Sequence, residues 1–559
     1  MGYSAAMQIP RLSGLAALAG LAALSGACAS LSPRADPGVR MLMGEVALER
    51  GEFGRAASEY RVAAAESGDA KIAEHAARIA FDHGQDRELE RIAHDWLQRD
   101  PKSEVALRFD AVALLLLDRR ADAALQFSTI IDTAYPAPAD AFLALNESLS
   151  EVRNDSGAAG VLGLLQSRYP TVPQAAYAHA SLALSAGDSP TALAAIQDAL
   201  TLKPGWREAR WLEARARVAG GDCAKGLAGA GALAAESTDG DRLLYAWLLA
   251  ACDRQAEARP FFEDLARGKN ARSEALDGLA SLDLDARRWD EATNHYTEML
   301  ATGRNTDRAF YGLALIADRR GDAAKAVRLY SRVVAGPRAV PAQLRAYRLL
   351  LAQGLPDDAA RELDDFIASV PEDRVATTAG RAQILSELGR GADALALLNR
   401  ATAAYPDREE FRYARAEVLE RKGEVGRAVA ELRDVARSRP DDATAQNALG
   451  FTLAEHGLDL TEAEGRIRTA LAARPDSPAI RDSLGWVLYR RGRLPEALDW
   501  LKRAYASDPD PEIATHLGEA QWTLGDAAAA EKTWRDALER SPDDTHLKEA
   551  LAHHLGRKP

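Results

Sequence analysis

The hydrophobic residues of this sequence fall in short blocks with helical spacing, and the blocks come in pairs. The clearest pair lies in residues 482–509. In its second block, Ala497, Leu501 and Ala504 are spaced i, i+4 and i+7, so they share one face of a helix. A pair of amphipathic blocks with a short polar interruption predicts a helical hairpin.

Glycine and proline mark the turns of this hairpin. Gly492 lies between the two blocks and supplies the short turn. Pro509 ends the second helix, because proline has no N–H and disfavours helical backbone in the residue before it. Gly485 lies inside the first helix, where glycine costs about 1 kcal/mol relative to alanine, so we expect it to allow close approach of the paired helix.

The same pattern repeats along the chain, with a small or apolar residue in the middle of each second helix. These positions are Ala56, Leu89, Ala124, Ala158, Ala192, Gly226, Ala258, Ala292, Ala326, Ala359, Ala394, Ala428, Ala463, Ala497 and Ala530. Their mean spacing is about 34 residues, which is the period of the tetratricopeptide repeat. The sequence therefore predicts an all-α, right-handed superhelical solenoid of about fifteen hairpins over residues 39–559, with the strongest repeats at about 375–542.

A hairpin this short cannot bury its apolar face alone, so the last one needs a cover. Residues 543–555 are expected to form a capping helix with an apolar stripe toward the array and a polar face toward water. The stripe contains Leu547, Leu551 and Leu555, and the polar face contains Lys548, His553 and His554.

Residues 205–305 form the weakest part of the pattern. The terminal prolines are missing, and five glycines (Gly220, Gly221, Gly226, Gly229 and Gly231) crowd one hairpin, which predicts a softer zone. Cys223 begins the second helix of one unit and Cys252 ends the first helix of the next, so the two lie side by side in this fold. A disulfide is geometrically reasonable in an oxidising compartment; two buried free thiols are the alternative.

The first 27 residues are predicted to be a signal peptide. Their uncharged core, residues 12–27, is shorter than the roughly 20 residues that span a bilayer. The core ends in Leu24-Ser25-Gly26-Ala27-Cys28, which resembles a lipoprotein cleavage box with Cys28 as the acylated residue. A plain secretory signal is the alternative. Residues 28–38 are then a lipidated tether, and Ala29 is similar to the sorting pattern of outer-membrane lipoproteins. Translation can start at Met1 or at Met7.

Charge and motifs point away from nucleic-acid binding and from catalysis. The formal net charge is −13 with no dense basic cluster, whereas nucleic-acid binders need a basic face. The glycines at 229 and 231 follow a helical segment instead of a strand, and the sequence has neither a phosphate-binding loop nor a nucleophile elbow. We expect no enzyme activity, cofactor or metal, and His83 is expected to be a turn or surface residue.

Protein binding is the remaining prediction, because the first helices of tetratricopeptide arrays line a concave face. Near the C-terminus the outward positions of these helices combine aromatic and hydrogen-bonding side chains, which suits a groove for a peptide or a helix. The candidates are Asn447, Phe451, Asp482, Trp486, Tyr489, Arg490, His516, Glu519 and Trp522. Packing of Phe451 and Trp486 between neighbouring first helices is the alternative.

Residues 447–453, 482–489 and 511–519, together with the cleavage box and residues 41–51, resemble proteobacterial tetratricopeptide lipoproteins. The resemblance implies an outer-membrane adaptor that faces the periplasm and brings a carboxyl-terminal processing protease to substrates such as peptidoglycan hydrolases. An assembly or pilotin-like lipoprotein of a secretion or export machine is the alternative. In either case the partners are proteins, and the lipid supplies the membrane contact.

Overall fold

The computed structural model describes residues 36–556 except 151, 153, 235–237, 407, 441, 476, 542 and 543. The predicted signal peptide, Cys28 and most of the tether lie outside the described residues. Over the described part of the chain the regular structure is helical, with one 3₁₀ turn, η1 (Pro371–Asp373). None of the described helices is long and apolar enough to cross a membrane.

The described helices form fifteen consecutive hairpins, as the period predicts. The first five hairpins pair α2 (Pro37–Glu49) with α3 (Phe53–Ser67), α4 (Ala70–Asp82) with α5 (Asp86–Leu97), α6 (Glu104–Leu116) with α7 (Arg120–Ala134), α8 (Pro138–Ser150) with α9 (Asp155–Arg168), and α10 (Pro173–Ser185) with α11 (Ser189–Leu202). The next five pair α12 (Arg207–Ala219) with α13 (Cys223–Ala234), α14 (Asp239–Ala251) with α15 (Gln255–Arg267), α16 (Arg272–Asp285) with α17 (Trp289–Ala301), α18 (Thr306–Arg319) with α19 (Ala323–Tyr330), and α20 (Ala339–Ala352) with α21 (Pro356–Ser369).

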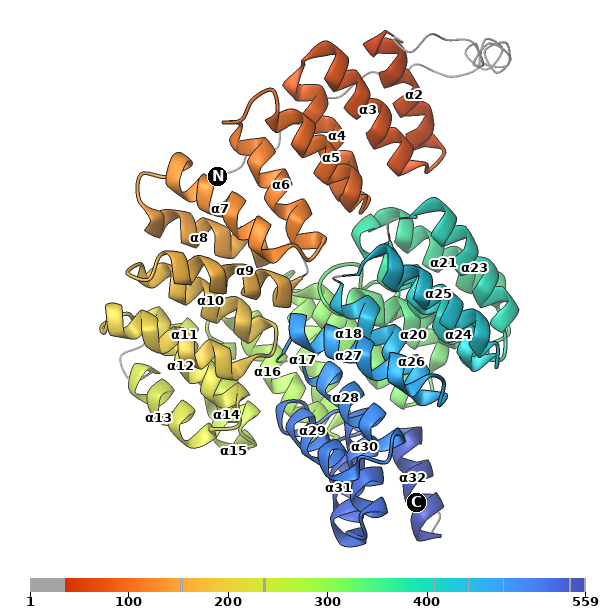
Figure 1. The fold of residues 1–559 in the computed structure, drawn as a ribbon. Coiled ribbons are helices and arrows are strands. Elements are labelled where there is room, and N and C mark those ends of the chain that lie inside the picture. The colour runs from red at the N-terminus through yellow and green to blue at the C-terminus, as the bar shows by residue number, and fades with distance from the viewer. Residues whose placement is uncertain are drawn as a thin grey trace.

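The last five hairpins pair α22 (Arg374–Glu387) with α23 (Gly391–Ala404), α24 (Glu410–Arg421) with α25 (Val425–Ser438), α26 (Ala443–Glu455) with α27 (Leu460–Ala473), α28 (Pro478–Arg490) with α29 (Leu494–Ser507), and α30 (Pro511–Thr523) with α31 (Ala527–Arg540). The capping helix α32 (Thr545–Leu555) follows. The hairpins stack along the chain into one curved array (Figure 1). The all-helical solenoid of about fifteen hairpins with a C-terminal cap is confirmed.

Close approach within each hairpin explains the small-residue marker. All fifteen marker positions lie in second helices and are buried. In the hairpin of α28 and α29, a Cβ on Gly485 would lie 2.6 Å from Leu501 Cγ and 3.2 Å from the carbonyl oxygen of Ala497. Gly492, in the turn, has φ +75°, a backbone conformation that side chains disfavour. Gly485 is therefore required by the packing of the two helices, and Gly492 by the backbone conformation of the turn.

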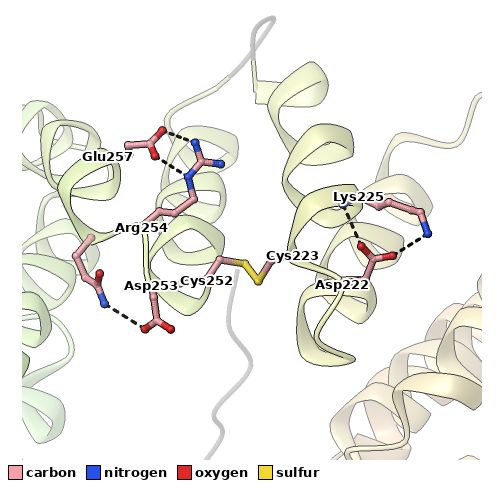
Figure 2. Close-up of a disulfide and its surroundings, with 8 residues drawn as sticks. Asp222, Cys223, Lys225, Cys252, Asp253, Arg254 and Glu257 are labelled. Atoms are coloured by element: carbon pink, nitrogen blue, oxygen red, sulfur yellow. Dashed lines mark hydrogen bonds and ion pairs between the residues drawn. A yellow bond between two sulfur atoms is a disulfide. The ribbon is translucent and has the colours of Figure 1, made fainter.

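A disulfide joins two adjacent hairpins in the middle of the array. Cys223 is the first residue of α13 and Cys252 is the C-cap of α14, and their Cα atoms lie 5.8 Å apart (Figure 2). Beside the bond, Asp222 accepts from Lys225 on one hairpin, and Arg254 donates two hydrogen bonds of 2.6 Å to Glu257 on the other. The structure thus contains the disulfide that was one of two sequence-based alternatives.

The array curves far enough for its two halves to touch (Figure 1). Turns within the first three hairpins meet loops between later hairpins, and we call this contact the seam. Its N-terminal side includes Phe53, His83, Asp86 and Asp118, and its C-terminal side includes Arg374, Tyr405, Arg408, Glu409 and Arg474. Arg474 Nη2 lies 2.7 Å from Asp118 Oδ2 although 356 residues separate them in sequence.

Candidate functional site

The predicted binding residues near the C-terminus lie on successive first helices, α26, α28 and α30, and several of them bind one another. Their aromatic rings form two groups, which together we call the aromatic ladder. The first is Phe451, Trp486, Tyr489 and His516 on α26, α28 and α30, and the second is Trp522 with Trp534 and His554 on α30, α31 and α32. His516 stacks on Trp486 with ring centroids 4.2 Å apart. Trp486 in turn stacks on Tyr489 with centroids 4.9 Å apart. The ladder therefore links neighbouring hairpins.

The centre of the ladder is a buried ion pair. His516 Nδ1 lies 2.9 Å from Asp482 Oδ2, and the two residues are 7% and 4% exposed. Burial alone would lower the pKa of His516, but the carboxylate of Asp482 outweighs it, so this pKa is raised. The charged histidine and Asp482 therefore hold α28 and α30 together.

Trp486 is part of the same internal network. It is 9% exposed, and its Nε1 donates a 2.7 Å hydrogen bond to Glu455 Oε2 on the preceding first helix. The guanidinium of Arg490 donates to the backbone carbonyl of Glu455 and lies over the Trp486 ring. Tyr489 Oη is 3.0 Å from Thr523 Oγ1 on α30.

The ladder ends on the capping helix. His554 Nε2 lies 2.7 Å from Glu519 Oε1, and the His554 ring stacks on Trp534 with centroids 5.1 Å apart. The Trp522 ring lies 4.7 Å from that of His554. The sequence-based expectation that His554 faces water is therefore wrong, because α32 packs against α30 and turns this side chain inward.

These contacts revise the predicted binding site. Asp482, Trp486 and His516 are buried and hold the first helices together, which for Trp486 is the packing alternative that the sequence left open. Partner binding at the nine predicted residues stays a prediction. The other six predicted residues are half-buried: Asn447, Phe451, Tyr489, Arg490, Glu519 and Trp522. Among them, Asn447 has a buried Oδ1 with no hydrogen-bond partner.

A groove that the sequence did not reveal lies further back in the array. Its volume is about 420 Å³, and three consecutive first helices, α20, α22 and α24, supply its walls. The lining residues are Leu344, Ala376, Ala379, Gly380, Gln383, Ser386, Glu410, Tyr413, Ala414, Glu417, Val418 and Arg421. No aromatic cluster or motif marks these positions in the sequence, because the groove arises from the angle between hairpins.

This groove contains hydrogen-bonding groups that the protein leaves unused. Ser386 is 7% exposed, and its Oγ has no hydrogen-bond partner. Tyr413 Oη is likewise buried without a partner, and burial raises the pKa of this hydroxyl, so it stays a neutral donor. Unpaired buried polar groups cost free energy unless something binds them. The groove is therefore suited to a ligand with polar groups.

The seam holds a second cavity, of about 900 Å³, which shares Glu410 and Tyr413 with the groove. The guanidinium of Arg374 lies 5.3 Å from the centroids of both Phe53 and Tyr405. His83 stacks on Phe53 at 3.7 Å, and burial with the charge of Arg374 lowers the pKa of His83 to about 4. His83 is thus a neutral residue of the seam instead of a simple surface residue.

The described residues contain no group of three or more His, Cys, Asp or Glu side chains that could hold a metal ion. The fold and the groove define a solenoid of tetratricopeptide type, a class whose repeats mediate protein–protein interactions. The chain matches the tetratricopeptide repeat family over residues 278–342, 344–409, 379–443, 413–458 and 453–511. The groove and most of the aromatic ladder lie within or directly beside these segments.

Relatives share parts of this arrangement. A TPR repeat-containing protein of Pseudomonas aeruginosa is 32% identical over 213 residues, which are 38% of this chain. The match spans only 36% of that protein's length. Among solved structures, a thermophilic TPR protein of Thermus thermophilus is 24% identical over 33% of this chain and 100% of its own, with a TM-score of 0.30. The Cut9–Hcn1 structure of the APC/C is 14% identical over 93% and 96%, with a TM-score of 0.30.

Proposed function

We propose that this protein is a lipid-anchored scaffold on the periplasmic face of the outer membrane. It binds a carboxyl-terminal processing protease and the substrates of that protease, such as peptidoglycan hydrolases. The observation that carries the protein-binding part is the groove on α20, α22 and α24, which combines apolar walls with two unpaired buried hydroxyls. The cleavage box before Cys28 and the resemblance to adaptor lipoproteins support the location and the partner.

The mechanism is an increase in effective concentration. A continuous array of fifteen hairpins has room for a protease and a substrate at separate places, so the second binding event becomes intramolecular. The groove and the C-terminal first helices are two such places. The lipid confines both partners to one membrane surface.

Photo-crosslinking in intact membranes tests the partner. A crosslinking residue replaces Gln383, which is exposed in the groove; a matched control replaces Leu125, which is 59% exposed on the second helix α7. We expect the groove position, and not the control, to capture a serine protease with a peptide-binding domain. Capture of secretion or assembly components alone would reject the adaptor function in favour of the assembly lipoprotein.

Metabolic labelling tests the anchor. Cells that express the full chain are given a clickable fatty acid, and we expect label on the wild-type protein and none on the Cys28→Ser variant. An unlabelled wild-type chain, released from membranes by buffer alone, would overturn the proposed anchor.

A further inference from the structure

The groove on α20, α22 and α24 carries an unneutralised carboxylate at its mouth. Glu417 on α24 is exposed, and the described residues offer it no hydrogen bond or ion pair. Two nearby carboxylates, in contrast, form ion pairs. Glu420 Oε1 lies 2.9 Å from His456 Nε2, and Glu431 Oε1 lies 2.9 Å from Arg412 Nε and 2.6 Å from Arg415 Nη2. Glu417 is therefore a groove-lining carboxylate that the described residues leave without an ion pair.

The surroundings of Glu417 are acidic overall. Glu410 also lines the groove, and its Oε1 lies 3.6 Å from Arg408 Nη1. Arg421 lies one helical turn after Glu417 on α24. Arg421 is exposed and forms no ion pair within 4.0 Å among the described residues. Although Glu417 is exposed, partial desolvation by the groove walls raises its pKa; the charges of Glu420 and Glu512 add to this rise, and Arg421 opposes it. A bound cation would relieve this repulsion.

Two hydroxyls complete the site. Ser386 Oγ and Tyr413 Oη are buried in the groove without partners, and each can donate to a carbonyl oxygen or accept from an N–H. The backbone of an extended peptide presents both groups. The small side chains of Ala376, Ala379 and Ala414 leave width for that backbone.

We propose that this groove binds an extended peptide segment that carries a lysine or arginine, with the cation at Glu417 and the peptide backbone at Ser386 and Tyr413. This proposal rests on the proposed scaffold function and adds the chemistry of the partner. A cationic segment is favoured over an acidic one because Glu417 has no ion pair and the carboxylates of Glu420 and Glu512 add to its negative charge, against Arg421 alone. The occupant is extended instead of helical, since a helix satisfies its own backbone groups and leaves both hydroxyls unpaired.

Peptide titration of the full chain, kept in detergent and with its disulfide intact, tests the proposal. The probes are fluorescein-labelled ten-residue peptides of alanine, serine and glycine with two central lysines, two glutamates or two glutamines. We expect the lysine peptide to bind about tenfold more tightly than the glutamine peptide, since a charge-assisted hydrogen bond is worth about that factor. The glutamate peptide should bind least.

Variants assign the binding to the groove. Glu417→Gln should remove the preference for lysine, and Glu417→Lys should reverse it toward glutamate. Glu539→Gln changes an exposed residue on the second helix α31, far along the chain from the groove, and should leave the preference unchanged. Tyr413→Phe should weaken all three peptides while the thermal unfolding midpoint stays equal or rises, because a buried unpaired hydroxyl is removed.

Equal binding of the lysine and glutamate peptides, or an unchanged preference in Glu417→Gln, would overturn the proposal. Weakening by Tyr413→Phe that comes with a lower unfolding midpoint would reject the backbone contact, because loss of fold would explain it. If photo-crosslinking recovers the protease but the lysine preference is absent, the scaffold function stands and this inference fails. If the lysine preference is present but photo-crosslinking captures no protein, this inference stands and the scaffold function fails.

Discussion

Two parts of this solenoid join neighbouring hairpins by different means. Around α12–α15, a disulfide between Cys223 and Cys252 ties one hairpin to the next. Around α26–α32, the aromatic ladder and the buried pair of Asp482 and His516 do so without a covalent bond. The fold is the same in both parts, but the linkage differs.

The composition of the helices explains the difference. Helix α13 contains Gly226, Gly229 and Gly231, which have no side chains to pack, and α15 contains Pro260 in its interior, which cannot donate a backbone hydrogen bond. In the C-terminal part the first helices α28 and α30 carry Trp486, Tyr489 and His516, which stack and bond across the boundary between two hairpins. A covalent bond and a packed polar–aromatic interface are thus alternative ways to couple repeats whose stability depends on their neighbours.

The largest expected effect is loss of the buried pair in the C-terminal part. Asp482→Ala leaves His516 buried without its counter-charge and should destabilise α28–α30 by about 3–5 kcal/mol. Hydrogen exchange resolved by segment measures this. The control is Asp499→Ala, whose pair with Arg503 is more than half exposed and should cost at most about 1 kcal/mol. Equal acceleration in the two variants would mean that the buried pair stabilises the C-terminal part no more than an exposed pair does.

Loss of the disulfide should have the next largest effect and should stay local. The double variant Cys223→Ala, Cys252→Ala is expected to lose about 2–4 kcal/mol, seen as faster exchange in α12–α15 while α28–α31 is unchanged. Reductant added to the wild type should accelerate exchange in α12–α15 in the same way. Reductant added to the variant should leave exchange unchanged. Exchange in α12–α15 as slow as in α28–α31 after reduction would contradict the predicted softness of this zone.

A change of pH should have a smaller effect, and it should change the stability of α28–α30 but not that of α12–α15. Because the folded-state pKa of His516 is raised, its stabilising contribution is complete below the ordinary histidine value near 6.5 and is lost as the pH rises through the folded value. Each unit of the shift corresponds to about 1.4 kcal/mol. Exchange in α28–α30 should therefore accelerate, after correction for intrinsic rates, as the pH rises above the ordinary histidine pKa near 6.5. The His516→Gln variant should abolish that dependence, and α12–α15 should not show it.

The smallest effect concerns the seam, which touches the loop before α28 and not the disulfide region. Arg474→Ala removes the pair with Asp118, whose partners are 31% and 24% exposed, and should cost about 1 kcal/mol or less. Faster exchange near residue 118 and in the loop at residue 474 is the expected result. Arg437→Ala, which removes a more exposed pair on α25, is the control. Acceleration that spreads through α28–α31 would mean that the C-terminal order depends on the seam and not on the ladder.

The sequence alone determined the repeat and the number of hairpins, because each hairpin needs a small residue at its crossing and a turn at its end. Gly485 and Ala497 meet where the two helices cross, and Gly492 supplies the positive φ of the turn between them. The same local geometry placed Cys223 next to Cys252. Such features depend on one hairpin and its neighbour, so they are visible in a periodic pattern.

Tertiary structure alone decided which first-helix residues pair with one another and which remain open. Trp486 and Tyr489 look alike in the sequence, but Trp486 lies under His516 and is buried, while Tyr489 stays half-exposed. The seam, with Arg474 beside Asp118, and the groove at Glu417 depend on small rotations between hairpins that accumulate along the array. The sequence pattern of one hairpin does not give the sum of these rotations, so these contacts could be identified only in the three-dimensional structure.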